Sequence, residues 1–212
     1  FAISSHYKAN LARESNMFDN EIVSITNNDE KINKDGGIRP NTSHEILDGL
    51  KLAFDENGTV TAGTASPLTD GASAVIVCEE EYAKKNNLNI LARIKSTAVV
   101  GCPPELMGLG PINASKKALK RANLSISDID IVELNEAFAS QSLACIKELK
   151  MDINKVNIHG GAIALGHPLG ATGARITGKV ATLLQNNNKK YGLATQCIGL
   201  GQGIATVLEN IN

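Results

Sequence analysis

Between residue 90 and the end of the chain, apolar segments of strand length alternate with segments of helical periodicity. Three strand–helix repeats are followed by two closing strands that a glycine-rich turn separates. This order, βαβαβαββ, predicts an α/β fold: a mixed, mostly parallel five-stranded sheet with helices on both faces, whose last hairpin is antiparallel. The predicted strands are 94–100, 129–134, 156–159, 191–198 and 203–208, and the predicted helices are 111–121, 136–150 and 169–184.

The first part of the chain has a different texture. Residues 1–68 combine a short helical segment at 5–13 and an alternating segment at 21–25, typical of an edge strand, with long polar stretches and turns. We expect a loop-rich region there. After it, the apolar run 73–78 predicts another strand and residues 79–86 predict a helix.

Charge and cysteine usage exclude several classes of protein. The 21 basic and 22 acidic side chains of the 212 residues leave a net charge of -1, which excludes nucleic-acid binding driven by charge. No apolar run approaches the ~18 residues of a membrane span, so we expect a cytoplasmic protein without a membrane partner. The four cysteines form no Cys-x-x-Cys pair, so neither a metal site nor a disulfide framework is expected. Because Phe1 is not an initiator Met, we also expect that a segment upstream has been removed or omitted.

Two nucleotide-binding motifs are excluded by their context. The stretch 173–179 has phosphate-loop spacing, but Val180 stands where a Ser or Thr would hold magnesium, and the stretch lies inside a helical pattern. The glycines of 199–203 lack both dinucleotide spacing and a following helix. We interpret both as packing and turn glycines.

Three side chains that could carry chemistry lie at or after the ends of predicted strands: Asn135, His167 and Cys197. Taken singly, Asn135 is more often a helix cap and Cys197 more often an inert buried thiol, while His167 is evenly balanced between a cap and a functional group. Sites in open parallel sheets gather at the carboxyl ends of strands, so the three residues are expected at one edge. A thiol, an imidazole and glycine N–H groups together favour acyl transfer or enolate formation beside a carbonyl.

The segments around these residues resemble the C-terminal signature blocks of the thiolases. The blocks are Asn135–Phe138, Gly160–Gly173 and Cys197–Gly199, and the segment Thr61–Ala72 is similar to the coenzyme A loop of that family. The resemblance extends over essentially the whole chain and implies a thiolase-like fold. It is greatest to the acetyl-CoA acetyltransferases, which condense two acetyl-CoA into acetoacetyl-CoA and CoA or run the reverse thiolysis.

The resemblance also implies roles for single residues. His167 would activate a nucleophilic cysteine and, with a water held by Asn135, stabilise the thioester oxyanion. Cys197 would take the α-proton of acetyl-CoA in condensation and return it in thiolysis, and the Gly199 N–H would complete a second oxyanion hole. No permanently bound cofactor or metal is implied: coenzyme A esters are the substrates, and the partner is a second copy of the chain, in a homodimer or homotetramer. The residues implied along the coenzyme path are Ser66, Phe54, Ala62, Leu68, Ala137 and Phe138, with Met107 bounding the acyl pocket and Arg39 near the nucleotide end.

The chain departs from the family pattern at Pro67 and Thr69 of the coenzyme loop, where Gly and Asn are commoner, and more widely in that nothing in it matches the nucleophilic cysteine of the N-terminal half. By resemblance, residues 1–68 are part of the coenzyme-binding loop domain, 69–90 the end of the N-terminal domain and 91–212 the C-terminal domain. The chain alone is then expected to be inactive. Two alternatives remain at this stage: a truncated, non-catalytic chain that binds coenzyme A or pairs with another subunit, and a degradative thiolase for longer acyl chains, although Met107 favours short ones.

Overall fold

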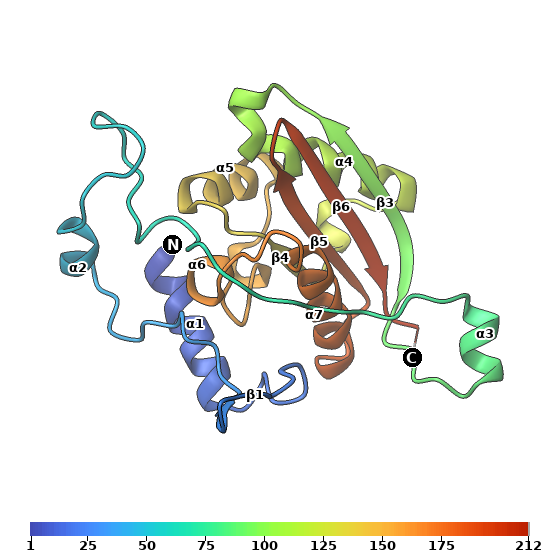
Figure 1. The fold of residues 1–212 in the computed structure, drawn as a ribbon. Coiled ribbons are helices and arrows are strands. Elements are labelled where there is room, and N and C mark those ends of the chain that lie inside the picture. Colours follow the sequence, from blue (N-terminus) through green and yellow to red (C-terminus); the bar gives the residue numbers. More distant parts are fainter. Residues whose placement is uncertain (212) are drawn as a thin grey trace.

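The computed structural model describes residues 1–211, which form a four-stranded sheet with helices on both faces (Figure 1). The strands are β3 (Arg93–Gly101), β4 (Ile131–Leu134), β5 (Tyr191–Ile198) and β6 (Gln202–Glu209), in the spatial order β3-β6-β5-β4. Strand β6 is antiparallel to both β3 and β5, and only β4 and β5 are parallel.

The α/β class and the mixed sheet with helices are confirmed, but two details of the predicted sheet are wrong. The sheet has four strands instead of five, because the predicted strand 156–159 pairs through a single parallel bridge between Val132 and Val156. Parallel pairing is also in the minority, since β3 lies beside β6 and not beside β4. Hydrophobic periodicity predicts where strands begin and end, but it carries no information on which neighbour each strand pairs with.

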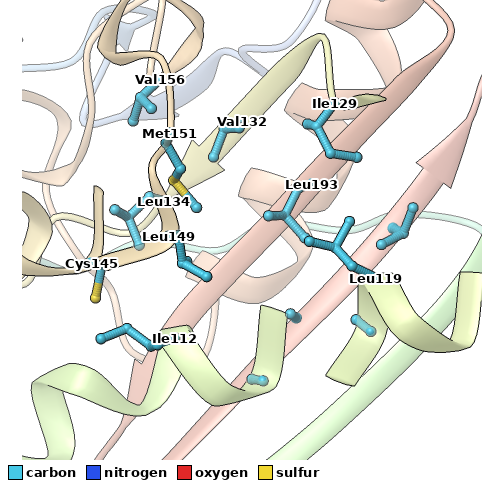
Figure 2. Packing of buried hydrophobic residues seen from close by; sticks show 14 of the residues in the cluster. Ile112, Leu119, Ile129, Val132, Leu134, Cys145, Leu149, Met151, Val156 and Leu193 are labelled. Atoms are coloured by element: carbon cyan, nitrogen blue, oxygen red, sulfur yellow. The ribbon is translucent and has the colours of Figure 1, made fainter. Parts of the chain in front are cut away.

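Helices cover the two faces of the sheet because successive strand residues point to opposite sides. Leu193 belongs to the apolar cluster under α4 (Gly110–Ala122) and α5 (Ala139–Leu149), whereas Ala194 belongs to the cluster under α7 (Thr172–Asn186). Figure 2 shows the first cluster, where side chains from α4 and α5 meet those of the strands. Two packed faces hold β4 and β5 rigidly, and these are the strands whose ends carry the predicted site.

The N-terminal region lies beside this layered unit. Helix α1 (Ala2–Glu14) packs against the short helix α6 (Ala162–Leu165), and the chain then runs through α2 (His44–Asp48) and long loops (Figure 1). The expected edge strand at 21–25 is wrong: the paired residues lie later, in a small hairpin of β1 (Ile25–Asn27) and β2 (Glu30–Ile32). The described residues also form three short 3-10 helices: η1 (Pro104–Leu109), η2 (Ile126–Asp128) and η3 (Ile153–Lys155).

The predicted strand at 73–78 is also wrong for this structure. The segment has no strand geometry and is exposed, with Ile76 93% accessible, although the helix predicted after it is present as α3 (Glu80–Lys85). An apolar segment becomes a strand only when a neighbouring strand satisfies its N–H and C=O groups, and residues 1–211 offer this segment none.

Two further observations concern the whole described chain. Within residues 1–211, no helix is long and apolar enough to cross a membrane. All four cysteines are free thiols: Cys145 and Cys197 are buried, Cys102 is half-buried and Cys78 is exposed.

Candidate active site

The ends of the parallel strands β4 and β5 bring Asn135 and Cys197 to one edge of the sheet. Asn135 directly follows β4, and its backbone N–H donates to the Thr195 carbonyl oxygen at 3.0 Å. Cys197 lies two residues after Thr195 on β5, and the side chains of Asn135 and Cys197 are both buried. The expectation that strand ends gather these residues is therefore met by the register of β4 on β5.

His167 lies in the turn between α6 and α7 and reaches the same edge. Its Nε2 atom is 3.3 Å from Asn135 Nδ2, and its Nδ1 atom is 2.6 Å from Thr172 Oγ1 in the first turn of α7. Its backbone N–H donates to Thr69 Oγ1 at 3.2 Å, and that hydroxyl donates to the Pro67 carbonyl at 2.7 Å. The imidazole is thus held through its ring and its backbone, with Nε2 directed at Asn135.

Burial favours the neutral form of both reactive groups. Desolvation lowers the pKa of His167, and the nearby Arg175 guanidinium lowers it further. Desolvation raises the pKa of Cys197, a direction that proximity to Cys102 reinforces and a backbone hydrogen bond opposes. The site therefore contains a neutral imidazole and a neutral thiol at pH 7. A neutral imidazole can accept a proton, and a thiol can donate one, which is the pair that proton transfer beside a carbonyl requires.

The turn after Cys197 exposes backbone next to the thiol. Gly199 is exposed, Leu200 has φ 68°, and Gly201 has φ 95°, a conformation that favours glycine. The Gly201 carbonyl accepts the Cys102 N–H at 2.8 Å, which joins this turn to the segment that leads into η1. Met107, the residue expected to bound the acyl pocket, lies on η1 and is half-buried.

The structure brings part of the predicted coenzyme path together. Ser66 donates its N–H to the Ala137 carbonyl at 3.0 Å and its hydroxyl to the same oxygen at 3.4 Å. The rings of Phe54 and Phe138 meet edge to face, with centroids 6.0 Å apart. An antiparallel bridge between Ala65 and Phe138 fixes this segment against the residues that follow Asn135.

The other predicted coenzyme residues lie apart or point outward. Leu68 and Ala62 are exposed. Arg39 is exposed as well, and its backbone N–H donates to His6 Nδ1 at 3.1 Å, which places this part of the loop against α1. Exposed side chains in a loop are free to contact a ligand, but within residues 1–211 no hydrogen bond or ion pair links these three residues to His167 or Cys197.

Sequence reasoning missed two residues that build the site. Glu136 is buried, and its carboxylate accepts hydrogen bonds from Ser5, Asn157 and the Ile163 N–H, at 2.6, 2.8 and 3.1 Å. Thr172, which is also buried, contacts the His167 ring. Both residues lie close to predicted site residues in the sequence, Glu136 beside Asn135 and Thr172 five positions after His167. Neither the carboxylate nor the hydroxyl has a spacing that distinguishes it from its neighbours, so the sequence alone does not assign them a role.

Polar atoms without a protein partner mark the same region. Among residues 1–211, Asn135 Oδ1 and Arg175 Nε and Nη2 are buried without a hydrogen-bond partner. No group of three His, Cys, Asp or Glu side chains in the described chain could hold a metal ion. A water or a substrate oxygen could satisfy the Asn135 amide, which agrees with the role that the resemblance implies for it.

Comparison with known proteins identifies the family. A family model described as "Thiolase, C-terminal domain" matches residues 88–210, and one described as "Thiolase, N-terminal domain" matches residues 1–81. The chain belongs to the thiolase family. Over 218 residues it is 55% identical to a 3-ketoacyl-CoA thiolase of Shewanella loihica, an alignment that covers 99% of this chain and 56% of that protein.

Solved thiolase structures share its fold. A crystal structure of human mitochondrial 3-ketoacyl-CoA thiolase in complex with CoA superposes with a TM-score of 0.96 at 45% identity, covering 99% of this chain and 53% of that one. The Bacillus anthracis acetyl-CoA acetyltransferase gives a TM-score of 0.94 at 43% identity, covering 98% of this chain and 54% of that one. The chain thus spans somewhat more than half the length of the thiolases it matches.

Proposed function

We propose that the protein of which this chain is a part is a thiolase that cleaves 3-ketoacyl-CoA with coenzyme A to give acetyl-CoA, and that also catalyses the reverse condensation. The observation that carries the proposal is that the His167 ring contacts the Asn135 amide at the sheet edge where β5 ends in Cys197, with a neutral imidazole and a neutral thiol. The names of the similar proteins favour a 3-ketoacyl-CoA substrate, and condensation of two acetyl-CoA to acetoacetyl-CoA is the shortest-chain case of the same reaction.

In this proposal His167 and Cys197 move separate protons. His167 Nε2 takes the proton of a nucleophilic cysteine in the part of the protein outside this chain, and the protonated ring then stabilises the thioester oxyanion with a water at Asn135. Cys197 gives its thiol proton to the α-carbon of the departing acetyl-CoA in thiolysis and takes it back in condensation. The Gly199 N–H lies in the turn after Cys197, where it can stabilise the enolate oxygen.

The binding residues and the division of the chain follow the same proposal. Ser66, Ala137 and Phe138 form the ordered part of the coenzyme path, and the exposed Leu68, Ala62 and Arg39 meet the ligand only when it binds. The division at 68 and 90 assigns 1–68 to the loop domain, 69–90 to the end of the N-terminal domain and the remainder to the C-terminal domain. The exposed segment 73–78 has the composition of a strand, which supports the proposal that the strands it pairs with lie in a part of the protein outside this chain. A homodimer or homotetramer is the proposed assembly.

The test is thiolysis by the full-length protein, measured as loss of the 3-ketoacyl-CoA absorbance with substrates from 4 to about 16 carbons. Activity across the series with a shallow length dependence would support a general 3-ketoacyl-CoA thiolase. Activity confined to acetoacetyl-CoA would assign the protein to the acetyl-CoA acetyltransferases, with Met107 as the wall that excludes longer chains. Binding of coenzyme A esters without turnover of any of them would refute the proposal and favour the non-catalytic alternative.

A further inference from the structure

One buried hydroxyl contacts the ring nitrogen of His167 that faces away from Asn135. Thr172 Oγ1 lies 2.6 Å from His167 Nδ1 and 3.0 Å from the Pro168 carbonyl oxygen, and the Thr172 side chain is fully buried. A threonine hydroxyl has one proton to donate and lone pairs to accept with. If that proton goes to the Pro168 oxygen, the hydroxyl can only accept at His167, so Nδ1 must carry the imidazole proton.

The local helix geometry favours this direction of donation. A threonine in a helix commonly donates its hydroxyl to the carbonyl four residues earlier, and Thr172 has that relation to Pro168. Thr177, about one and a half turns further along α7, makes the same bond to the Gly173 carbonyl at 2.7 Å, and within residues 1–211 its hydroxyl makes no hydrogen bond to a histidine. The same orientation therefore occurs elsewhere in this helix, and at Thr172 it leaves a lone pair directed at the ring.

The opposite side of the ring is consistent with the same assignment. His167 Nε2 faces the amide nitrogen Nδ2 of Asn135 at 3.3 Å, and an amide N–H needs an acceptor. An Nδ1–H imidazole presents a lone pair at Nε2 and meets this requirement. Burial, and after it the Arg175 guanidinium, lowers the pKa of His167 and disfavours a second proton on the ring, so His167 rests in one neutral tautomer.

We propose that Thr172 is a positioning residue that fixes His167 as the Nδ1–H tautomer, so that Nε2 alone exchanges protons during the reaction. This inference rests on the proposed function, because it assigns the base to the nitrogen beside Asn135. The resting Nε2 lone pair can accept the proton of the nucleophilic thiol, and the Nε2–H formed in that step can then donate to the substrate oxyanion. The second proton stays on Nδ1, hydrogen-bonded to the Thr172 oxygen throughout, and no proton needs to cross the ring.

Two measurements on the full-length protein test the proposal. Neutron diffraction from crystals exchanged into D₂O is expected to show deuterium on Nδ1 of resting His167 and none on Nε2. Thr172→Val removes the hydroxyl at nearly constant volume and is expected to lower kcat about tenfold with little change in KM, since one buried hydrogen bond that selects the reactive tautomer is lost. Thr172→Ser keeps the hydroxyl and is expected to stay within about threefold of wild type.

Thr177→Val is the matched control, because it removes the same helix bond without touching His167. Deuterium on Nε2 of the resting enzyme would overturn the proposal, and so would an equal loss of kcat in Thr172→Val and Thr177→Val, which would make the hydroxyl merely structural. A loss in Thr172→Ser as large as in Thr172→Val would also overturn it. A protein without thiolase activity that still carries deuterium on Nδ1 would refute the proposed function and leave the tautomer assignment standing.

Discussion

Replacing Glu136 with Ala should destabilise the protein more than any change at its surface. The buried carboxylate accepts three hydrogen bonds, from the Ser5 hydroxyl, the Asn157 amide and the Ile163 N–H. The three donors belong to α1, to the segment after η3 and to α6. The Glu136 side chain, next to Asn135 in the sequence, therefore links three separate elements. In Glu136→Ala all three donors would lose their acceptor inside the protein.

The expected decrease in the free energy of unfolding follows from the number of hydrogen-bond donors left without an acceptor. A buried donor left without a partner costs about 1–3 kcal/mol, so three of them give roughly 3–6 kcal/mol after water enters part of the space. That is a large share of the ~5–15 kcal/mol that stabilises a typical domain. The Ser5 hydroxyl also accepts the Gly161 N–H at 3.1 Å, so the loop that leads to His167 should loosen as well and kcat should fall.

The assay is urea denaturation of the full-length protein, followed by circular dichroism and by thiolysis activity on the same samples. The matched control is Glu148→Ala, which removes an exposed carboxylate paired with Lys116 at 3.0 Å and is expected to leave the unfolding midpoint almost unchanged. A loss below about 1 kcal/mol for Glu136→Ala, or equal effects of the two substitutions, would refute the reasoning that the buried network holds this edge of the sheet together.

Two further perturbations test the electrostatics and the backbone of the site. Burial raises the pKa of Glu133 to about 7, so the folded state binds this proton more tightly than the unfolded state and stability falls as pH rises from about 4.5 to about 7. Glu133→Gln should therefore match wild type at pH 4 and exceed it by up to about 3 kcal/mol at pH 8 in urea denaturation, and a pH-independent difference would contradict this. Gly201→Ala places a methyl group against the Cys102 carbonyl oxygen at a residue whose φ is +95°. The substitution should lower the free energy of unfolding by about 1–3 kcal/mol. It should also lower kcat, because the turn that carries Gly199 must move. Gly170→Ala, where the added carbon meets nothing within 4 Å, should change neither quantity.

The elements of the layered unit could be predicted from the sequence because each has a complete local signal. The predicted strands 191–198 and 203–208 agree with β5 and β6 to within a residue, and the predicted helix 111–121 agrees with α4. Each of these segments packs against neighbours that are present within residues 1–211. The apolar face that its hydrophobic periodicity predicts is therefore the face that is buried.

Pairing and long-range contacts could not be predicted in this way. The segment 73–78 has the composition of a strand but no neighbouring strand here, and the segment 156–159 pairs only at Val156. At the site, the sequence identified Asn135, His167 and Cys197 through their blocks. The role of Glu136 depends on Ser5, 131 positions away, a relation that no local pattern contains.

The most direct test of the central claim, that Cys197 carries the α-proton, uses Cys197→Ala in the full-length protein. The variant is incubated with radiolabelled acetyl-CoA, and both covalent labelling of the protein and thiolysis of acetoacetyl-CoA are measured. Because His167 and its hydroxyl partners are unchanged, labelling should persist, while thiolysis should fall by about 10²–10⁴-fold through loss of the acid. Thiolysis at the wild-type rate would contradict the assignment of Cys197, and loss of labelling together with thiolysis would show that Cys197 acts in the acylation step instead.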